Sequence, residues 1–543
     1  MNAFVRFAAV AVVACAAAAC STPVPQALKP PDVPPAFVGP LTPGAPIWPN
    51  PDWWNNFGSI ELSGLVTTAQ TDNLDIAVAM ANVLQAEANR DIAGAALFPT
   101  FDLQGTASRS RTPGSSFTTV GPNGQPITAG GAFTGNQFGL LLNGTYYADI
   151  WGLARDNLRA AQEALKSSQF AQQEVALTTT ASVADTYLLV LALRQEIATI
   201  EQNIDAAKRI LTITRAKVTN GVSSQLDLSQ QEATVYGQEA ALPPLREQER
   251  EAVFSLAILL GRPPEGFTVT AQNMDALKAP PVNPGLPSEL LERRPDVAQA
   301  EANLASAHAN VDAARAAFFP QINLTGDGGF ASAAIGTLFR ASSLEWSVGA
   351  SALQTVFDGG KLIGQSDLAK AQQQGLIATY RKTVFTAFEG VENSLGQVGN
   401  FSEEENALQQ EVTASANAFR ISELQYREGI ADLLSVLQAQ QTLFTAENLL
   451  IQVKLSRLQA SVGLYLALGG GWAENPEDKT QTVPQPAIPI EPASAPAAQP
   501  SSAPAPPPTT APTSASPAAP PPAVTPSPSP PTVTPSPSPP AKT

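Results

Sequence analysis

The segment Asn310-Val311-Asp312-Ala313-Ala314-Arg315-Ala316-Ala317-Phe318-Phe319-Pro320 repeats an earlier part of the chain. It matches Asn89–Pro99, 221 residues upstream. Further on, Gly221 matches Gly429 with an offset of 208 residues, so the first copy has the longer loop. Self-similarity at a fixed offset indicates two copies of one supersecondary unit. Each copy is predicted to run helix, strand, loop, strand, long helix, turn and long helix.

Four short strands are predicted, two in each copy. They lie at about 100–110, 136–148, 321–331 and 344–357. In the third strand Leu324 and Phe330 fall on one face, and Asn323 and Asp327 fall on the other. Such alternation over about ten residues is typical of transmembrane β-strands, and equally of any half-buried sheet. The connecting loops, 109–136 and 331–343, are rich in Gly, Ser and Thr, which favours the membrane interpretation.

The predicted long helices are unusually long and keep heptad spacing. The first runs from Leu153 to Asn220, about 67 residues, which gives a helical path of about 100 Å. The heptad positions are Ile197, Ile200, Ile204, Ala207, Leu211, Thr214 and Val218 in the first copy, and Leu434, Leu437, Phe444, Ile451, Leu455, Leu458 and Val462 in the second. Polar seam residues, Gln441 and Asn448, suggest that the helices enclose water, although a solid coiled-coil stalk is the alternative. Gly469-Gly470-Gly471 marks the end of the last helix.

Barrel closure limits how four strands can cross a membrane. Lipid tolerates no open sheet edge, and the smallest single-chain barrels have about eight strands. Several chains must therefore share one barrel. Three chains would give twelve strands and a channel, whereas two would give eight strands plugged by side chains.

Two proline-rich ends flank the folded part, and they hold most of the 49 prolines. We predict five segments: a signal peptide at 1–19, a lipidated arm at 20–51, the first repeat at 52–265, the second repeat at 266–475 and a tail at 476–543. The tail is almost only Pro, Ala, Ser and Thr, so it cannot bury a core and is predicted to be disordered.

The N-terminal segment has the features of a secretory signal, with Arg6 followed by an apolar stretch that is too short to span a bilayer. Ala17-Ala18-Ala19-Cys20-Ser21 resembles a bacterial lipoprotein cleavage box, in which Cys20 becomes the lipidated first residue. Cys15 and a plain cleaved signal are the alternatives. We expect Cys20 to anchor the protein, and Ser21 to direct it to the outer membrane.

Enzymatic chemistry and nucleic-acid binding find little support in the sequence. The net charge of −16 would repel phosphates. The single histidine, His308, has no Cys or carboxylate partners at metal-ligand spacing, and Glu403–Glu405 reads as a solvated helix face. We therefore predict no catalytic residue, no metal site and no cofactor. A structural coiled-coil lipoprotein is a further alternative, but it would not explain the strands.

Three motifs carry a family resemblance that covers about 52–475. They are Leu286–Val297 with Ala316–Pro320, then Phe357–Lys361, then Tyr426–Gly429. Together they resemble the TolC-like outer-membrane efflux factors, in their lipoprotein branch. The resemblance implies a mostly α fold with a small β part: a trimeric α-barrel of long helical hairpins joined to a shared 12-strand transmembrane β-barrel.

The resemblance also implies a function. The protein would be the exit duct of a tripartite efflux system in the Gram-negative outer membrane, anchored by lipid and extending into the periplasm. Its partners would be two further copies of the chain, a periplasmic adaptor protein, an inner-membrane RND-type pump and outer-membrane lipid. A type I secretion exit duct is the alternative.

The functional ends implied by the resemblance are the helical turns at 220–223 and 428–431. Gly221, Val222, Gly429 and Ile430 would dock onto the adaptor. Both glycines also read as helix C-caps, which is compatible with docking.

A gate is implied near the same turns, at Asp227, Tyr426, Arg427 and Asp432. The sequence departs from the family here. The family has an Arg that pairs with the Asp at the position of Asp227, but this chain has Ala431 in its place. The family also has rings of Asp at two positions where this chain has Ser435 and Gln438. We expect Asp227 and Asp432 to form an acidic constriction. The alternative is that both are acids favoured by the positive end of a helix dipole.

Overall fold

The computed structural model describes residues 33–39, 47–113, 117–120, 122, 125–129, 132–279 and 283–472. These residues belong to one compact unit. The predicted signal, Cys20 and the predicted tail at 476–543 lie outside the described residues.

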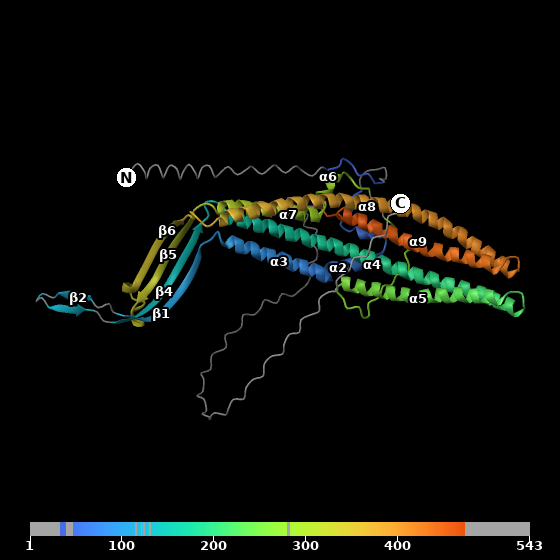
Figure 1. The fold of residues 1–543 in the computed structure, drawn as a ribbon, viewed down its shortest axis with the longest axis horizontal. Helices are drawn as coiled ribbons and strands as arrows, with labels where there is room; N and C mark the ends of the chain where they lie inside the picture. Colours follow the sequence, from blue (N-terminus) through green and yellow to red (C-terminus); the bar gives the residue numbers. More distant parts are fainter. Residues whose placement is uncertain are drawn as a thin grey trace, which may run out of the picture. The chain divides into compact units, whose positions relative to one another are not determined.

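The described part is a doubled arrangement of helices and strands (Figure 1). The first copy contains α3 (Leu74–Ala95), β1 (Thr100–Thr112), β4 (Phe133–Ala148), α4 (Leu153–Thr219) and α5 (Gln225–Leu259). The second contains α7 (Pro295–Ala316), β5 (Gln321–Ser332), β6 (Leu344–Leu353), α8 (Lys361–Arg427) and α9 (Leu433–Ala467). Smaller elements are η1 (Trp53–Phe57), α2 (Ile60–Asp72), β2 (Phe117–Val120), β3 (Pro126–Ala129), α6 (Pro287–Leu290), η2 (Ile335–Thr337) and η3 (Ala341–Ser343).

The two copies match in helix length. α3 and α7 have 22 residues each, α4 and α8 have 67, and α5 and α9 have 35. Figure 1 shows the sheet at one end of the long helices and both helical turns at the other. The internal repeat therefore gives two parallel copies of a strand-pair and hairpin unit.

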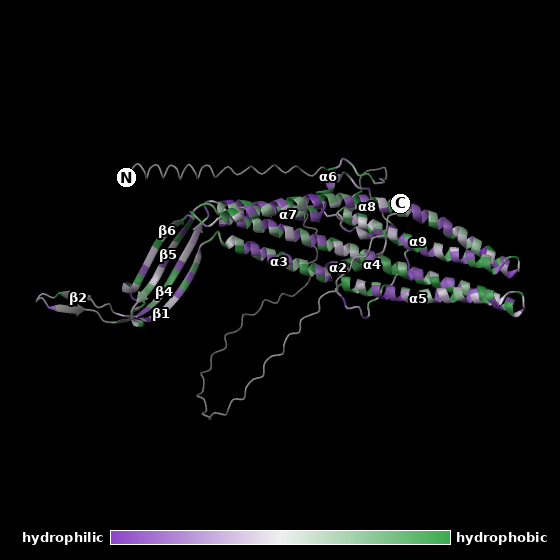
Figure 2. Cartoon of the chain, viewed as in Figure 1, coloured by the Kyte–Doolittle hydropathy of each residue, from purple (hydrophilic) through white to green (hydrophobic). Residues whose placement is uncertain are grey.

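The main sheet is antiparallel, in the order β1-β4-β5-β6, and confirms the prediction of four strands per chain. One row across it contains Asp102, Asn143, Asp327 and Ser347, and Ser347 Oγ donates to Asp327 Oδ2 over 2.7 Å. The next row points to the opposite face and contains Leu103, Leu142 and Trp346. Figure 2 shows this mixture of hydrophilic and hydrophobic residues along the strands. β1 and β6 form the two edges and are exposed along their whole length.

The structure differs from the sequence prediction around the loops. The predicted loop at 109–136 contains a second small sheet, in which β2 pairs with β3. Its β-branched residues give it strand propensity, but the surrounding Gly and Ser residues hide this in the sequence. β6 ends at Leu353, before the expected 357, because the chain there begins the turn that leads to α8.

Only α4 among the described helices has an 18-residue window apolar enough to cross a membrane. That window is 61% buried inside the protein, as in a core helix. Buried residues of α4 between Ala181 and Leu193 lie in the main core, which also contains Trp53 stacked on Tyr465 with ring centroids 5.0 Å apart. The apolar stretch of α4 is therefore explained by packing.

The glycine triplet after α9, Gly469–Gly471, lies in close contact with other parts of the chain. Gly469 has φ +84°, and an added Cβ would lie 1.7 Å from the backbone oxygen of Arg293. Gly470 and Gly471 also have positive φ, and their added Cβ atoms would meet Leu177 and Asn50 at 2.1 and 2.3 Å. Arg294 Nη1 donates to the Ala467 oxygen over 2.6 Å. The triplet therefore does more than end the helix: it lets the end of α9 pack against three distant segments.

Polar side chains run between α4 and α9. Asn203 Nδ2 on α4 and Glu447 Oε2 on α9 are buried and have no hydrogen-bond partner in the described part of the chain. Asp185 lies on α4, and its buried carboxylate oxygen Oδ1 also has no hydrogen-bond partner in the described part of the chain. Burial raises the pKa of Asp185 to about 7.

Gly469→Ala is expected to lower the free energy of unfolding by about 3 kcal/mol or more, because it combines backbone strain with a clash against backbone. Gly375→Ala is the matched control, since that glycine lies inside α8 with no atom within 4 Å of an added Cβ. Its effect should be a gain of up to about 1 kcal/mol. Equal stability of the two variants in denaturant unfolding would contradict the packing described.

Asp185→Asn is expected to stabilise the protein at pH 8 but not at pH 4. The folded-state pKa is raised above the ordinary value of about 3.9, so wild-type stability should fall as pH rises from about 4 to 7. The variant should lack this slope. Parallel pH dependence of the unfolding midpoints in both proteins would show that Asp185 is not the cause.

Candidate functional site

Each helical hairpin ends in a turn closed by a glycine. After α4, Val222 N donates to the Lys217 oxygen over 2.8 Å and Gly221 N donates to the Val218 oxygen over 2.9 Å. This is a Schellman motif, and Gly221 adopts the left-handed conformation that it requires, with φ +71°.

The turn after α8 repeats this geometry. Ile430 N donates to the Gln425 oxygen over 2.8 Å, Gly429 N donates to the Tyr426 oxygen over 3.1 Å, and Gly429 has φ +77°. Both glycines are therefore helix C-caps, as the sequence allowed. Each cap leaves the next apolar side chain in solvent, because Val222 is 73% exposed and Ile430 is 76% exposed.

The two predicted gate acids both lie at the N-terminal end of a helix. Asp227 accepts hydrogen bonds from Ser223 Oγ at 2.6 Å and from Ser224 N at 2.9 Å, which together lower its pKa. With Ser224 it completes a capping box at the start of α5.

Asp432 is the N-cap of α9. Its Oδ1 accepts hydrogen bonds from Ser435 Oγ at 2.6 Å and from Ser435 N at 2.9 Å, and both bonds lower its pKa. The charge of Asp227 acts in the opposite direction, so the two turns bring these carboxylates within electrostatic range. Ser435 therefore donates two hydrogen bonds to Asp432.

Tyr426 links the two hairpins just above their turns. Its side chain is 3% exposed, and its hydroxyl lies 3.0 Å from Thr214 Oγ1. The Thr214 hydroxyl already donates a hydrogen bond to the Ile210 oxygen, so Tyr426 is the donor in this pair. Lys217 Nζ lies 4.6 Å from the centre of the Tyr426 ring. The contact joins α8 to α4.

Arg427 does not share this contact. It is exposed and pairs with the neighbouring Glu428 at 3.1 Å. Conversely, the sequence did not single out Thr214 and Lys217 for this role. Thr214 occupies a heptad position, and a buried hydroxyl at such a position is the signal that could have pointed to a polar partner.

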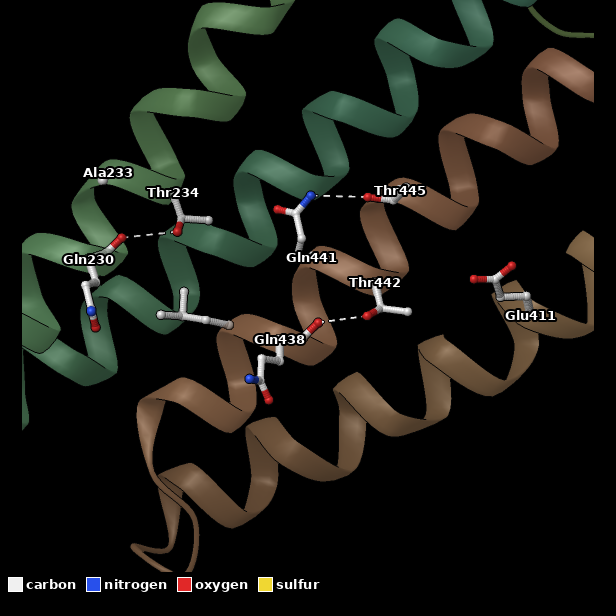
Figure 3. A pocket seen from close by; sticks show the side chains of 9 residues that line it. Gln230, Ala233, Thr234, Glu411, Gln438, Gln441, Thr442 and Thr445 are labelled. Carbon is white, nitrogen blue, oxygen red and sulfur yellow. Dashed lines mark hydrogen bonds between the residues drawn. The ribbon is translucent and has the colours of Figure 1, made fainter. Parts of the chain in front are cut away.

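A groove of about 950 Å³ lies between α5, α8 and α9 behind the turns. Its lining is mostly uncharged amide and hydroxyl side chains, as Figure 3 shows, and consists of Gln230, Ala233, Thr234, Glu411, Leu437, Gln438, Gln441, Thr442 and Thr445. Glu411 is the one charged residue in this lining.

The comparison with protein families decides the class. The model of the outer membrane efflux protein family matches residues 65–262 and 286–470. The chain belongs to this family. Members of this family are efflux channels and not enzymes. Of the function classes considered from the sequence, the efflux channel is therefore retained, and the enzyme and the purely structural lipoprotein are excluded.

Curated relatives agree over most of their length. The pyoverdine export outer membrane protein OpmQ of Pseudomonas aeruginosa is 38% identical over 423 residues, which cover 77% of this chain and 87% of the relative. The probable efflux pump outer membrane protein TtgC of Pseudomonas putida is 34% identical, over 78% of this chain and 85% of the relative.

Solved structures of outer-membrane channels have the same fold. The channel OprN is 26% identical with a TM-score of 0.72, covering 83% of this chain and 99% of OprN. The open state of Neisseria gonorrhoeae MtrE is 26% identical with a TM-score of 0.72, covering 83% and 98%. This chain is therefore an outer-membrane component of an efflux pump, with a TolC-like fold that extends into the periplasm.

His308 has a structural contact. Its Nδ1 lies 3.0 Å from Gln373 Nε2, so this pair joins α7 to α8. Within the described ranges, no three His, Cys, Asp or Glu side chains are grouped as metal ligands.

Proposed function

We propose that three copies of this chain form one passive exit duct, with a shared 12-strand barrel and a periplasmic tunnel of helical hairpins. The unpaired edges of β1 and β6 support this assembly, because lipid would leave their backbone groups without partners. The energy for export comes from an inner-membrane pump, which we expect to be of the RND type.

The adaptor is proposed to dock at the turns that carry Gly221 and Gly429. Val222 and Ile430 are the apolar contacts, and the mostly uncharged groove between α5, α8 and α9 accepts a helix of the adaptor. The relatives carry different substrate names, including pyoverdine, antibiotic and toluene. This variety supports a duct that leaves substrate choice to the pump.

The gate is proposed to combine an acidic constriction with a latch. Asp227 and Asp432, placed by their capping hydrogen bonds, would contribute six carboxylates in a trimer. Tyr426, through Thr214, holds α8 against α4, and Arg427 lies beside it at the end of α8. Opening requires the hairpins to separate when the adaptor binds, which breaks the Tyr426 contact.

The membrane anchor is proposed to be a lipid on Cys20. The cleavage-box residues Ala17–Ser21 support it, and the family membership agrees with an outer-membrane destination.

Replacing Gly221 with Val is expected to abolish export while trimers still assemble. The added side chain has open space, since nothing lies within 4 Å of an added Cβ, so the damage comes from φ +71° alone. Gly221→Asn is the matched control, because Asn tolerates the left-handed region and should keep most export. Export by live cells and trimers on unboiled gels are the two measurements. Normal export by Gly221→Val would refute docking at this turn.

Asp227→Ala with Asp432→Ala is expected to change single-channel conductance and weaken block by divalent cations. Tyr426→Phe should raise the open probability at least about fivefold, since it removes one hydrogen bond of about 1 kcal/mol from each of the three chains. Tyr236→Phe, at an exposed tyrosine of α5, is the control. Unchanged conductance and block in the double variant would rule out the constriction, and an unchanged open probability in Tyr426→Phe would rule out the latch.

A further inference from the structure

A piece of the N-terminal arm packs on the middle of α8. Phe37 is 6% exposed and lies in a cluster with Val384, Phe388 and Leu395. The arm segment at 33–39 is separated from these residues by about 350 positions, so the contact is a feature of the tertiary fold.

Glu392 holds the backbone next to Phe37. Its Oε1 accepts a hydrogen bond from Val38 N at 2.7 Å, and its Oε2 accepts one from Gly39 N at 2.8 Å. A carboxylate that takes two consecutive amides makes a pair of charge-assisted hydrogen bonds. At Gly39 an added Cβ would lie 2.8 Å from Leu395 Cβ, so only glycine allows this close approach.

The chain is held again a few residues later. Ile47 N donates to the Asn283 oxygen over 2.8 Å, and Trp48 stacks under Arg293, whose guanidinium lies 4.5 Å from the ring centre. The arm is therefore fixed on the folded part at two places, at residues 37–39 and at residues 47–48.

The length of chain between Cys20 and Val38 can be compared with the distance along α8 from the Glu392 contact to the sheet. Glu392 is 31 residues after Lys361, where α8 begins below the sheet, which is about 46 Å of helix. Val38 is 18 residues after Cys20, and 18 residues span at most about 65 Å. Fully extended, the chain between Cys20 and Val38 is therefore long enough to reach from the Glu392 contact to the end of the sheet, with about 19 Å in excess.

We propose that Glu392 is the docking site for the chain's own arm, and that the arm is a tether of limited length between the lipid on Cys20 and the middle of α8. Such a tether keeps the middle of α8 within about 65 Å of the lipid on Cys20. The inference rests on the proposed lipid anchor, and it adds Glu392, Phe37 and Gly39 as the residues that hold the tether's lower end.

The docking site is tested first. In Glu392→Ala, hydrogen exchange of the peptide that contains Val38 and Gly39 should be at least about tenfold faster than in the wild type, because the local opening becomes easier. Glu389→Ala, one helical turn away at an exposed position of α8, is the control and should leave exchange unchanged. Trimer assembly and conductance are measured alongside to show that both variants fold. Unchanged exchange in Glu392→Ala would overturn the docking site.

The tether is tested by arm length. Deleting residues 24–31 places Val38 ten residues after Cys20, and ten residues span at most about 36 Å and cannot cover about 46 Å. In the lipidated protein this deletion should raise exchange at Val38 and Gly39 at least about tenfold. Inserting eight residues at the same place should not. The same deletion in Cys20→Ala, exported behind an ordinary cleavable signal, should leave exchange as in the wild type.

Two results would overturn the tether: unchanged exchange in the shortened lipidated protein, or an equal rise with and without lipid. The mass of the N-terminal peptide shows whether Cys20 carries lipid. An unlipidated Cys20 would refute the anchor and the tether together, while channel conductance in the same preparation would still report on the duct.

Discussion

The constraint on which this structure depends is the backbone hydrogen bonding of its sheet edges. Among the described residues β1 and β6 each pair on one side only, and both strands are exposed along their length. Water can satisfy such an edge, but the hydrocarbon core of a membrane cannot. A four-stranded sheet with apolar side chains such as Trp346 and Val348 on one face is therefore incomplete by itself. Further copies of the chain are proposed to supply the missing partners.

The doubled helices follow from the same architecture. Each strand pair leads into a 67-residue helix that returns as a 35-residue helix, so each chain delivers two turns to the same end. The turns depend on local rules, namely a glycine with positive φ and an acid that caps the next helix. Because Asp227 and Asp432 are held by these caps, their carboxylates have defined positions. The proposed constriction and the helix caps would then be two consequences of one geometry.

Local patterns made much of the fold predictable. The repeat of Asn89–Pro99, the alternation around Asp327 and the glycines at 221 and 429 each report on nearby backbone, and they gave the elements and turns. Contacts between distant segments were not predictable in this way. The Tyr426 bond to Thr214, the packing of Gly469 against Arg293 and the hold of Glu392 on Val38 join residues far apart in sequence. β2 and β3 were missed because Gly and Ser around them signal a loop.

The shared barrel is tested most directly by cross-linking its edges. Cysteine pairs, with one residue on β1 and one on β6, would be scanned along both strands in the outer membrane of cells. The barrel predicts disulfides between β1 of one copy and β6 of another, at a consistent register, giving covalent species that stop at three chains. Cross-links that stop at two chains, or that join β1 only to β1, would contradict it.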